Sequence, residues 1–595
     1  MVPETLVDML SVVNVQTALP ILFLSVDMSF SIRRLLLLSL LAVTKARAGS
    51  FSNESKRIRG RSLECSPKTF QEIQTQDGVT ITVLSAQYTN GTVNSTVYGA
   101  ITNVPTVCAV TVNVVNTTDT KAIPSLPSSN YTFGLFLPDK YNNKILTVGG
   151  YSFAGGINWP NMAEGAHYGF AAISTDNGHA SAQADIQSWG NDRAKQLDWG
   201  YRALHGSVVL GKAMTNHYYG SNFSYSYYSG CSTGGRQGLK EIQYDATSFD
   251  GALIGAPAWD TANLNPWVGK MAKYLLDNGA QPISNTQTNA TIQAVLKQCD
   301  LSDSQPPGQR DNIVSEPEKC KFDISSVQCP NPNTTGATCL SKAQVTAIKN
   351  FYMDYSIPSG LVSHGWFPGS EREWATAYFG YPTGLTGFDF DYERYMMDLG
   401  SSFSYKNFSD DTTALSQIRN PGNATANQTD IRAYRDRGGK ILMYHGTADG
   451  LIPTLASDLY YTKSISSMNT TKDELRSWFR YFRVPGMNHC TYSDIYNAPW
   501  DFAGAGQASA LLQLGFGQGY SVPNDKGELA DPRYDALMAL TEWVENKKPV
   551  DQIIASAFNP PRTRVICPDP EKPTYNTTAG NTTAAINTAA NWHCS

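Results

Sequence analysis

The chain carries little net charge. Its 46 Lys and Arg residues are set against 51 Asp and Glu residues, which gives a formal net charge of −5 at pH 7. Proteins that bind nucleic acid usually gather basic side chains on one face to neutralise phosphates. The lack of any basic excess therefore argues against nucleic acid as a partner. A hydrophobic fraction of 41% over 595 residues is typical of a globular protein with a large core.

Long hydrophobic runs are also missing. The apolar run at residues 35–43 is far shorter than the roughly 20 residues that span a bilayer. It follows Arg33 and Arg34 and precedes a small-residue cleavage sequence that ends at Ala48, as in a secretory signal peptide. We therefore expect translation to start at Met28 and residues 1–48 to be a precursor segment. A transmembrane anchor is the alternative.

Cysteine is sparse, but its number, ten, is even. That is typical of proteins from oxidising compartments, where cysteines pair. The chain is also rich in Asn-x-Ser/Thr acceptor sequences for N-glycosylation. They begin at Asn53, Asn90, Asn94, Asn116, Asn130, Asn222, Asn289, Asn333, Asn407, Asn423, Asn427, Asn469, Asn576 and Asn581. We expect a secreted, extracellular glycoprotein.

Short strands and helices alternate along much of the chain. Strands are expected at residues 79–84, 95–100, 131–137, 144–148, 224–229 and 252–254, and helices at 199–214 and 236–244. Such alternation indicates a parallel α/β sheet. Residues 258–430 lack it and are rich in Pro, Asn, Thr and Gly, so we interpret them as an inserted lid domain. Core strands at 439–445 and 478–485 and a closing helix at 536–545 follow.

Ser232 stands in the sequence Gly-Cys-Ser-Thr-Gly-Gly at residues 230–235, between an expected strand and an expected helix. A nucleophile elbow needs this order, and it needs small residues around the serine so that the strained turn can close. The motif alone is common, but its context predicts an α/β-hydrolase fold with Ser232 as nucleophile. The catalytic domain would consist of residues 49–257 and 431–595, on either side of the lid.

An acid and a histidine follow the serine in the order that this fold requires. Asp449 comes just after one expected strand, and His489 lies on a loop after the next. We predict that His489 is the general base and that Asp449 orients its imidazole. Asp176 and Asp198 are weaker candidates for the acid because they precede the serine.

Two backbone N–H groups are expected to form an oxyanion hole. One belongs to Thr233, directly after the nucleophile. We assign the second to Gly150, in a glycine-rich loop at residues 149–156 that follows an expected strand, as that donor loop should. Two other histidines, His179 and His445, are expected to support the site or the core.

Cysteines stand next to both catalytic candidates: Cys231 precedes Ser232, and Cys490 follows His489. If the serine and the histidine form a nucleophile–base pair, they approach to about 3 Å. Their neighbours then come near disulfide range, with Cα atoms roughly 5.5 Å apart. A bond between the two cysteines would tie the elbow to the histidine loop across the inserted lid.

The paired Cys-Ser and His-Cys sequences, with an Asp between them, resemble those of the fungal tannase and feruloyl esterase family. The likeness covers essentially the whole mature chain and includes residues 175–179, 230–239, 434–446 and 592–594. It implies a secreted serine esterase, without a catalytic cofactor, that cleaves feruloyl, p-coumaroyl or caffeoyl esters of plant cell-wall polysaccharides. The elbow looks more like that of type B feruloyl esterases. A tannase that acts on galloyl esters is the alternative.

The same resemblance implies a cysteine pairing and a calcium site. The implied disulfides are Cys231–Cys490, Cys65–Cys108, Cys299–Cys320, Cys329–Cys339 and Cys567–Cys594. The family's lid often carries closely spaced acids, whose oxygens suit Ca²⁺. The implied ligands are Asp300, Asp303, Gln309, Asp311 and Ile313. The third acid is displaced relative to the family pattern, so a solvated acidic loop without structural calcium is the alternative.

The expected lid is rich in aromatic residues, which either form a pocket for a flat phenolic group or form the lid's own core. They are Trp259, Trp267, Trp366, Phe367, Trp374, Tyr378 and Phe379. Two more distant functions remain: a secreted serine peptidase would use the same triad, and a non-catalytic binding protein can share this fold. The sequence gives no indication of an oligomeric state.

Overall fold

The computed structural model of the protein describes residues 62–118, 121, 125–182, 184–300, 310–333, 336–378, 388–491, 500–507, 520–558 and 561–595. The expected precursor segment, residues 1–48, lies outside this range, as do Asp303, Gln309 and Phe379. Among the residues described, no helix is both long and apolar enough to cross a membrane.

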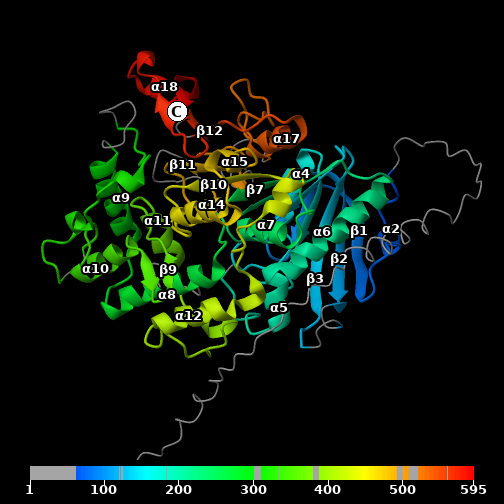
Figure 1. The fold of residues 1–595 in the computed structure, drawn as a ribbon, viewed down its shortest axis with the longest axis horizontal. Helices are drawn as coiled ribbons and strands as arrows, with labels where there is room; N and C mark the ends of the chain where they lie inside the picture. The colour runs from blue at the N-terminus through cyan, green and yellow to red at the C-terminus, as the bar shows by residue number, and fades with distance from the viewer. Residues whose placement is uncertain are drawn as a thin grey trace, which may run out of the picture. The chain divides into compact units, whose positions relative to one another are not determined.

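A nine-stranded sheet in the order β1-β2-β3-β5-β4-β6-β7-β10-β11 lies at the centre of the protein (Figure 1). Its strands are β1 (Val79–Ser95), β2 (Gly99–Asn116), β3 (Ser129–Pro138), β4 (Lys144–Val148), β5 (Ala171–Thr175), β6 (Tyr225–Cys231), β7 (Gly251–Gly255), β10 (Lys440–Gly446) and β11 (Phe479–Val484). The pairs from β1 through β3 to β5 are antiparallel. All pairs from β5 through β4, β6, β7 and β10 to β11 are parallel. The predicted parallel sheet is therefore present, with an antiparallel extension on one side.

Helices cover both faces of the parallel strands. In β10, Leu442 and Tyr444 pack in one hydrophobic cluster, and Ile441 and Met443 pack in another, as the two-residue period of a strand requires. The first cluster also takes side chains from α4 (Trp159–His167) and α17 (Ala536–Asn546). The second takes them from α6 (Ala203–Tyr219), α7 (Thr233–Tyr244) and α14 (Thr454–Met468). A mostly parallel sheet between two helical layers is the architecture of an α/β-hydrolase.

The chain between β7 and β10 leaves the sheet. Residues 292–299 pack in the same cluster as Leu442 and Tyr444, and much of the rest of this stretch builds a separate hydrophobic cluster. The elements of the stretch are α8 (Thr261–Asp277), α9 (Asn285–Cys299), α10 (Lys342–Phe351), β8 (Tyr355–Ile357), β9 (Gly360–Ser363), α11 (Glu371–Glu373) and α12 (Asp410–Arg419). Trp267, Trp366 and Trp374 lie at the centre of that cluster, each about 1% exposed or less. This stretch is the one that the sequence predicts as a lid, and we call it the lid below.

The N-terminal strands differ from the prediction in length. Two short strands were expected at residues 79–84 and 95–100, whereas β1 and β2 are 17 and 18 residues long and pair along their whole length. Asn90 and Gly91, two residues that favour turns, lie inside β1. The hairpin accommodates them through irregular register near Thr89 and Gly91.

All five disulfides that the family resemblance implied are present. They are Cys65–Cys108, Cys231–Cys490, Cys299–Cys320, Cys329–Cys339 and Cys567–Cys594. The last one joins the end of β13 (Pro561–Ile566) to β15 (Trp592–Cys594), which pairs with β14 (Pro573–Tyr575). The C-terminal tail is therefore held to the body of the protein by covalent and strand contacts.

Candidate active site

Ser232 lies at the sharp turn between β6 and α7, as the elbow motif predicts. Its backbone has φ 62° and ψ −125°, a region that residues with a side chain seldom adopt. The turn is held from both sides: the Ser232 N–H donates to the Gly255 oxygen at 3.0 Å, and the Ser232 carbonyl accepts the Ala258 N–H at 3.0 Å. The strained conformation at the serine is thus fixed by its surroundings.

The small residues around Ser232 are required by close backbone approach. A Cβ atom on Gly230 would lie 2.7 Å from the Gly234 carbonyl carbon, and one on Gly149 would lie 2.5 Å from the Gly234 Cα. Contacts this short do not occur between real atoms, so larger residues would push the elbow away from the neighbouring loop. Tyr228, on β6, donates its hydroxyl hydrogen to the Gly234 carbonyl at 2.5 Å and adds to the packing.

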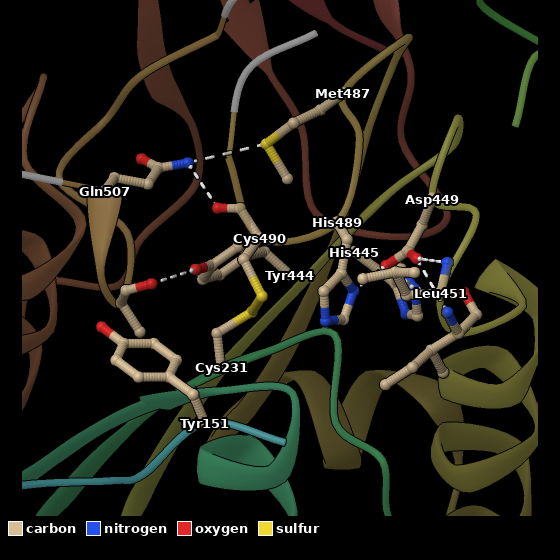
Figure 2. Close-up of a disulfide and its surroundings, with 12 residues drawn as sticks. Tyr151, Cys231, Tyr444, His445, Asp449, Leu451, Met487, His489, Cys490 and Gln507 are labelled. Carbon is tan, nitrogen blue, oxygen red and sulfur yellow. Dashed lines mark hydrogen bonds and ion pairs between the residues drawn. A yellow bond between two sulfur atoms is a disulfide. The ribbon is translucent and has the colours of Figure 1, made fainter. Parts of the chain in front are cut away.

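The predicted base and acid are in direct contact. The His489 Nδ1 and the Asp449 Oδ2 are 2.7 Å apart (Figure 2). Asp449 follows β10 and His489 follows β11, and these strands are parallel neighbours. Their carboxyl ends therefore lie at one edge of the sheet, which is where ligands bind in folds of this kind. Because Nδ1 faces a carboxylate, it carries the hydrogen, and Nε2 is left as the basic nitrogen.

Asp449 is surrounded by donors. Its Oδ1 accepts the N–H groups of Leu451 and Ile452 at 2.9 and 2.8 Å. Its Oδ2 contacts His445 Nε2 at 2.9 Å as well as His489. Burial alone would raise the pKa of Asp449, but the two imidazoles and their hydrogen bonds outweigh it and hold that pKa well below its usual range. Asp449 is therefore a fixed negative charge next to the general base.

His445 supports the acid, within the role that the sequence suggested. It is fully buried on β10, and its Nδ1 lies 2.7 Å from the Ser457 Oγ. Its Nε2 faces two acceptors, the Ile452 carbonyl at 3.1 Å and the Asp449 carboxylate. Nε2 therefore carries the hydrogen, and His445 acts as a second donor to the acid of the triad.

The environment of His489 favours its charged form. Burial lowers the pKa of the imidazole, but the Asp449 carboxylate and, to a smaller extent, Glu373 raise it, and the net shift is upward from 6.5. An imidazole beside a fixed carboxylate is a stronger base than a free one, which suits removal of a proton from a serine hydroxyl.

Ser232, Thr233 and His489 share one cleft of about 310 Å³. One part of its wall comes from loops of the sheet domain and includes Phe153, whose ring stacks on Trp199 at 5.2 Å between centroids. The lid supplies the other part: Leu264, Val268, Tyr378 and Phe388. The nucleophile and the base therefore open into a mostly apolar, aromatic-walled space.

Most of the aromatic residues predicted for this pocket lie elsewhere. Of those described, Tyr378 alone lines the cleft, and Trp267, Trp366 and Trp374 form the lid's own core. Trp259 packs behind the elbow, where its indole N–H donates to the Ala456 carbonyl, and Phe367 is buried. The aromatic wall is instead supplied by Phe153, Trp199 and Phe388. These residues carried no motif, and their meeting depends on the tertiary fold.

The oxyanion prediction needs one correction. Thr233 lies at the first position of α7 and lines the cleft, as expected. Gly150 does not line it: its N–H donates to the Gln237 Oε1 at 2.9 Å, which directs that hydrogen away from the site. The next residue, Tyr151, does line the cleft. In this loop the N–H of Gly150 is therefore bound by Gln237, and the residue after it lines the cleft.

The predicted disulfide next to the catalytic residues is present. Cys231 and Cys490 are bonded, with their Cα atoms 6.0 Å apart across 259 residues of sequence (Figure 2). Cys490 itself has φ 66°, and its carbonyl accepts a hydrogen bond from Gln507 at 3.1 Å. The loop that carries His489 is thus fixed at Cys490 by a disulfide through the side chain and by a hydrogen bond to the backbone carbonyl.

The described residues do not fit the implied calcium site. The Asp300 carboxylate accepts the N–H groups of Asp311 and Asn312 at 3.3 and 3.0 Å. Asp311 is bound by the Arg564 guanidinium at 2.6 Å, and its carbonyl by Arg562. Two guanidinium groups beside the same acids oppose a divalent cation. Within the part of the chain that the structure describes, no cluster of metal-ligating groups includes either acid.

The two weaker candidates for the acid, and one of the two histidines expected to support the site or the core, lie outside the cleft. The Asp176 carboxylate caps the N–H of Gly178 at 2.8 Å. Asp198 is paired with Arg202 at 2.9 Å. His179 stacks against Trp189, at 4.1 Å between ring centroids. None of these three lines the cleft, which is consistent with the prediction that Asp449 is the acid and His489 the base.

Comparison with known proteins agrees with this geometry. The family model described as tannase and feruloyl esterase matches residues 108–591. The chain belongs to the tannase and feruloyl esterase family. It is 31% identical over 429 residues to a probable feruloyl esterase B-1 of Aspergillus oryzae, covering 71% of this chain and 74% of that one. It is 30% identical over 430 residues to feruloyl esterase B of Aspergillus niger, covering 71% and 76%.

A solved relative supports the same assignment. The crystal structure of feruloyl esterase B from Aspergillus oryzae has a TM-score of 0.74 and 26% sequence identity, covering 89% of this chain and all of that one. The chain is thus a carboxylic ester hydrolase with an α/β-hydrolase fold, and the serine mechanism fits the site described above.

Proposed function

We propose that this protein is a secreted esterase that releases feruloyl and related hydroxycinnamoyl groups from plant cell-wall polysaccharides through an acyl-enzyme on Ser232. The observation that carries the proposal is the cleft, where the nucleophile and the base open between aromatic rings. A flat phenolic acyl group gains both burial and ring stacking in such a space. The relatives named as feruloyl esterases support the same substrate class.

The first half-reaction follows from the contacts of His489. With the hydrogen of Nδ1 donated to Asp449, Nε2 takes the proton of the Ser232 hydroxyl as its oxygen attacks the ester carbonyl. We assign the oxyanion to the N–H groups of Thr233 and Tyr151. The Tyr151 N–H has no hydrogen-bond partner among the residues described. The imidazolium then gives its proton to the leaving sugar oxygen as the tetrahedral intermediate collapses.

Water completes the cycle. The same Nε2 removes a proton from a water molecule that attacks the acyl-enzyme, and then returns a proton to Ser232 as the phenolic acid leaves. The Asp449 charge stabilises the imidazolium in both halves. No metal or cofactor is needed for any of these steps.

The test is a hydrolysis panel of methyl ferulate, caffeate, p-coumarate, sinapate and gallate with the wild type and with Ser232→Ala. We expect the wild type to prefer hydroxycinnamates and the variant to lose at least about 10³-fold in kcat, because removing one triad member leaves only residual catalysis. Preferred hydrolysis of gallate would instead indicate a tannase. A wild type active on peptide bonds but not on these esters would contradict the proposal.

Secretion is part of the proposal. Of the acceptor asparagines in the described residues, all but the half-buried Asn116 are exposed, as glycan attachment requires. All ten cysteines form disulfides, which agrees with an oxidising compartment. N-terminal sequencing of protein from the culture medium should give a chain that begins after Ala48.

A further inference from the structure

One carboxylate of the lid contacts both loops of the acid–base pair. Glu373, in the short helix α11, accepts the backbone N–H of His489 at 2.9 and 3.1 Å on its two oxygens. Its Oε2 also accepts the N–H of Gly450, the residue after the acid, at 2.8 Å. Glu373 lies 116 residues before His489 in the sequence, and no motif marks it.

The packing around this contact leaves little room for movement. A Cβ atom on Gly450 would lie 2.3 Å from the Ser370 oxygen and 2.8 Å from the Glu373 Cβ, so the acid loop needs glycine there to approach the lid. One residue further on, the Leu451 carbonyl accepts a hydrogen bond from the Tyr378 hydroxyl. The lid segment at residues 370–378 therefore contacts two successive residues of the loop that follows Asp449, Gly450 and Leu451.

The charges of Glu373 and His489 also affect one another's pKa values. Burial and the neighbouring Asp449 charge raise the pKa of Glu373 to about 7, while the charge of His489 lowers it. In turn, Glu373 is one of the groups that raise the pKa of His489. Among the described residues, the titratable groups in contact with His489 are Asp449 and Glu373, and His445 and Tyr378 lie behind them.

We propose that Glu373 is a positioning residue: its carboxylate holds the histidine loop and the acid loop at a fixed separation, so that the docked lid is part of the catalytic apparatus. The disulfide ties the histidine loop to the elbow, and Glu373 ties it to the acid loop. His489 is then fixed in relation to both of its partners. This inference rests on the assignment of His489 as general base.

The main test is Glu373→Gln, assayed on 4-nitrophenyl acetate so that the result does not depend on the acyl preference proposed above. The amide NH₂ group would face N–H donors, which loosens at least one loop. We expect kcat to fall by about 10- to 100-fold, because small misplacement of reacting groups is costly. KM should change much less, since no substrate contact is lost.

The pH profile separates positioning from simple packing. Removing the negative charge near His489 should lower the pKa of His489. The decline of kcat/KM on the acidic side of the pH profile, called the acid limb below, should therefore move to lower pH in Glu373→Gln. Glu373→Asp keeps the charge on a side chain one methylene shorter. It should restore the position of the limb while recovering only part of kcat.

Glu371→Gln is the matched control. Glu371 lies in the same helical turn, but its hydrogen bonds go to the Tyr352 hydroxyl and the Gly369 N–H, within the lid. We expect its pH limb to match that of the wild type. Titration with a fluorophosphonate that labels Ser232 counts competent sites in each variant, so that kcat is expressed per folded enzyme.

The inference is overturned if Glu373→Gln retains wild-type kcat per labelled site. The inference is also overturned if the acid limb of Glu373→Gln stays at the wild-type pH and Glu371→Gln loses as much kcat as Glu373→Gln does. If the wild type itself reacted with neither the aryl ester nor the fluorophosphonate, the triad assignment would fail and this inference with it. Failure on ferulate alone, with normal aryl-ester kinetics, would contradict the proposed substrate and leave the role of Glu373 standing.

Discussion

At the scale of single residues, the members of the proposed triad are held mainly through their backbone surroundings. Ser232 is fixed by hydrogen bonds from Ala258 and to Gly255, and Asp449 by two consecutive N–H groups of its own loop. Side-chain contact between members of the triad comes on top of this scaffold. A substitution in one member should therefore remove chemistry without dissolving the site.

The charge of Asp449 should be essential. In Asp449→Asn the amide can no longer stabilise an imidazolium, and it favours the wrong tautomer of His489. We expect kcat to fall by roughly 10⁴-fold, as for an acid-to-amide change in other triads. Steady-state kinetics on an aryl ester measures it. Asp176 is a half-buried acid that does not line the cleft, so Asp176→Asn should stay near the wild type; equal losses in both variants would refute the assignment.

The pH dependence should reflect the raised pKa of His489. The imidazole must be neutral to accept the serine proton, and its pKa lies above 6.5 in the folded protein. kcat/KM should therefore decline as pH falls through a value above 6.5. Asp449, whose pKa is depressed, should add no step in that range. A profile of kcat/KM against pH that stays flat to pH 5 would contradict this expectation.

At the scale of elements, the site is made by loops at the carboxyl ends of β6, β10 and β11. The Cys231–Cys490 bond crosses between the first and the last of these loops. It closes 259 residues of sequence, so it should stabilise the protein as well as align the site.

Replacing both cysteines by alanine should therefore have two effects. We expect the free energy of unfolding to fall by about 2–4 kcal/mol, the usual range for a disulfide. We also expect kcat to fall at temperatures where circular dichroism shows unchanged secondary structure, because the histidine loop loses its link to the elbow. Full activity in the folded double variant would mean that this disulfide serves stability alone.

The sequence predicts the parts of the site that depend on local pattern. The elbow, the acid and the base each stand beside a strand, and strand order in this fold brings them together. The Gly150 N–H was predicted to face the oxyanion, but it donates to a distant side chain, Gln237, which the local pattern does not reveal. Glu373 and Phe388 could not be predicted, since both reach the site only through the path of the lid.

The same limit applies to the acidic loop at Asp300 and Asp311. The family resemblance implied calcium there, but Arg564, 253 residues beyond Asp311, binds one of the two acids. Chelation should therefore have little effect: we expect the melting temperature after EDTA dialysis to stay within about 1 °C, the shift that roughly 1 kcal/mol produces in a chain of this size. Thermal unfolding with and without added Ca²⁺ measures it, and a large calcium-dependent shift would restore the metal site.

At the scale of the whole molecule, the acceptor asparagines in the described residues are exposed except for the half-buried Asn116, and none of them lines the cleft. Enzymatic deglycosylation of the secreted protein should therefore lower its apparent mass while leaving kcat on small esters unchanged. Gel mobility and kinetics before and after treatment test this. A loss of activity without unfolding would place a glycan at the mouth of the cleft.

The wall of the cleft has two separate origins. Phe153 and Trp199 belong to the part of the chain before the nucleophile, and Val268 and Phe388 belong to the insertion after it. The insertion can therefore diverge among descendants of one gene, changing which acyl group fits, while the hydrolytic residues stay fixed. A chimera that receives its insertion from a relative should acquire the donor's acyl preference, provided that the graft brings a carboxylate at the position of Glu373.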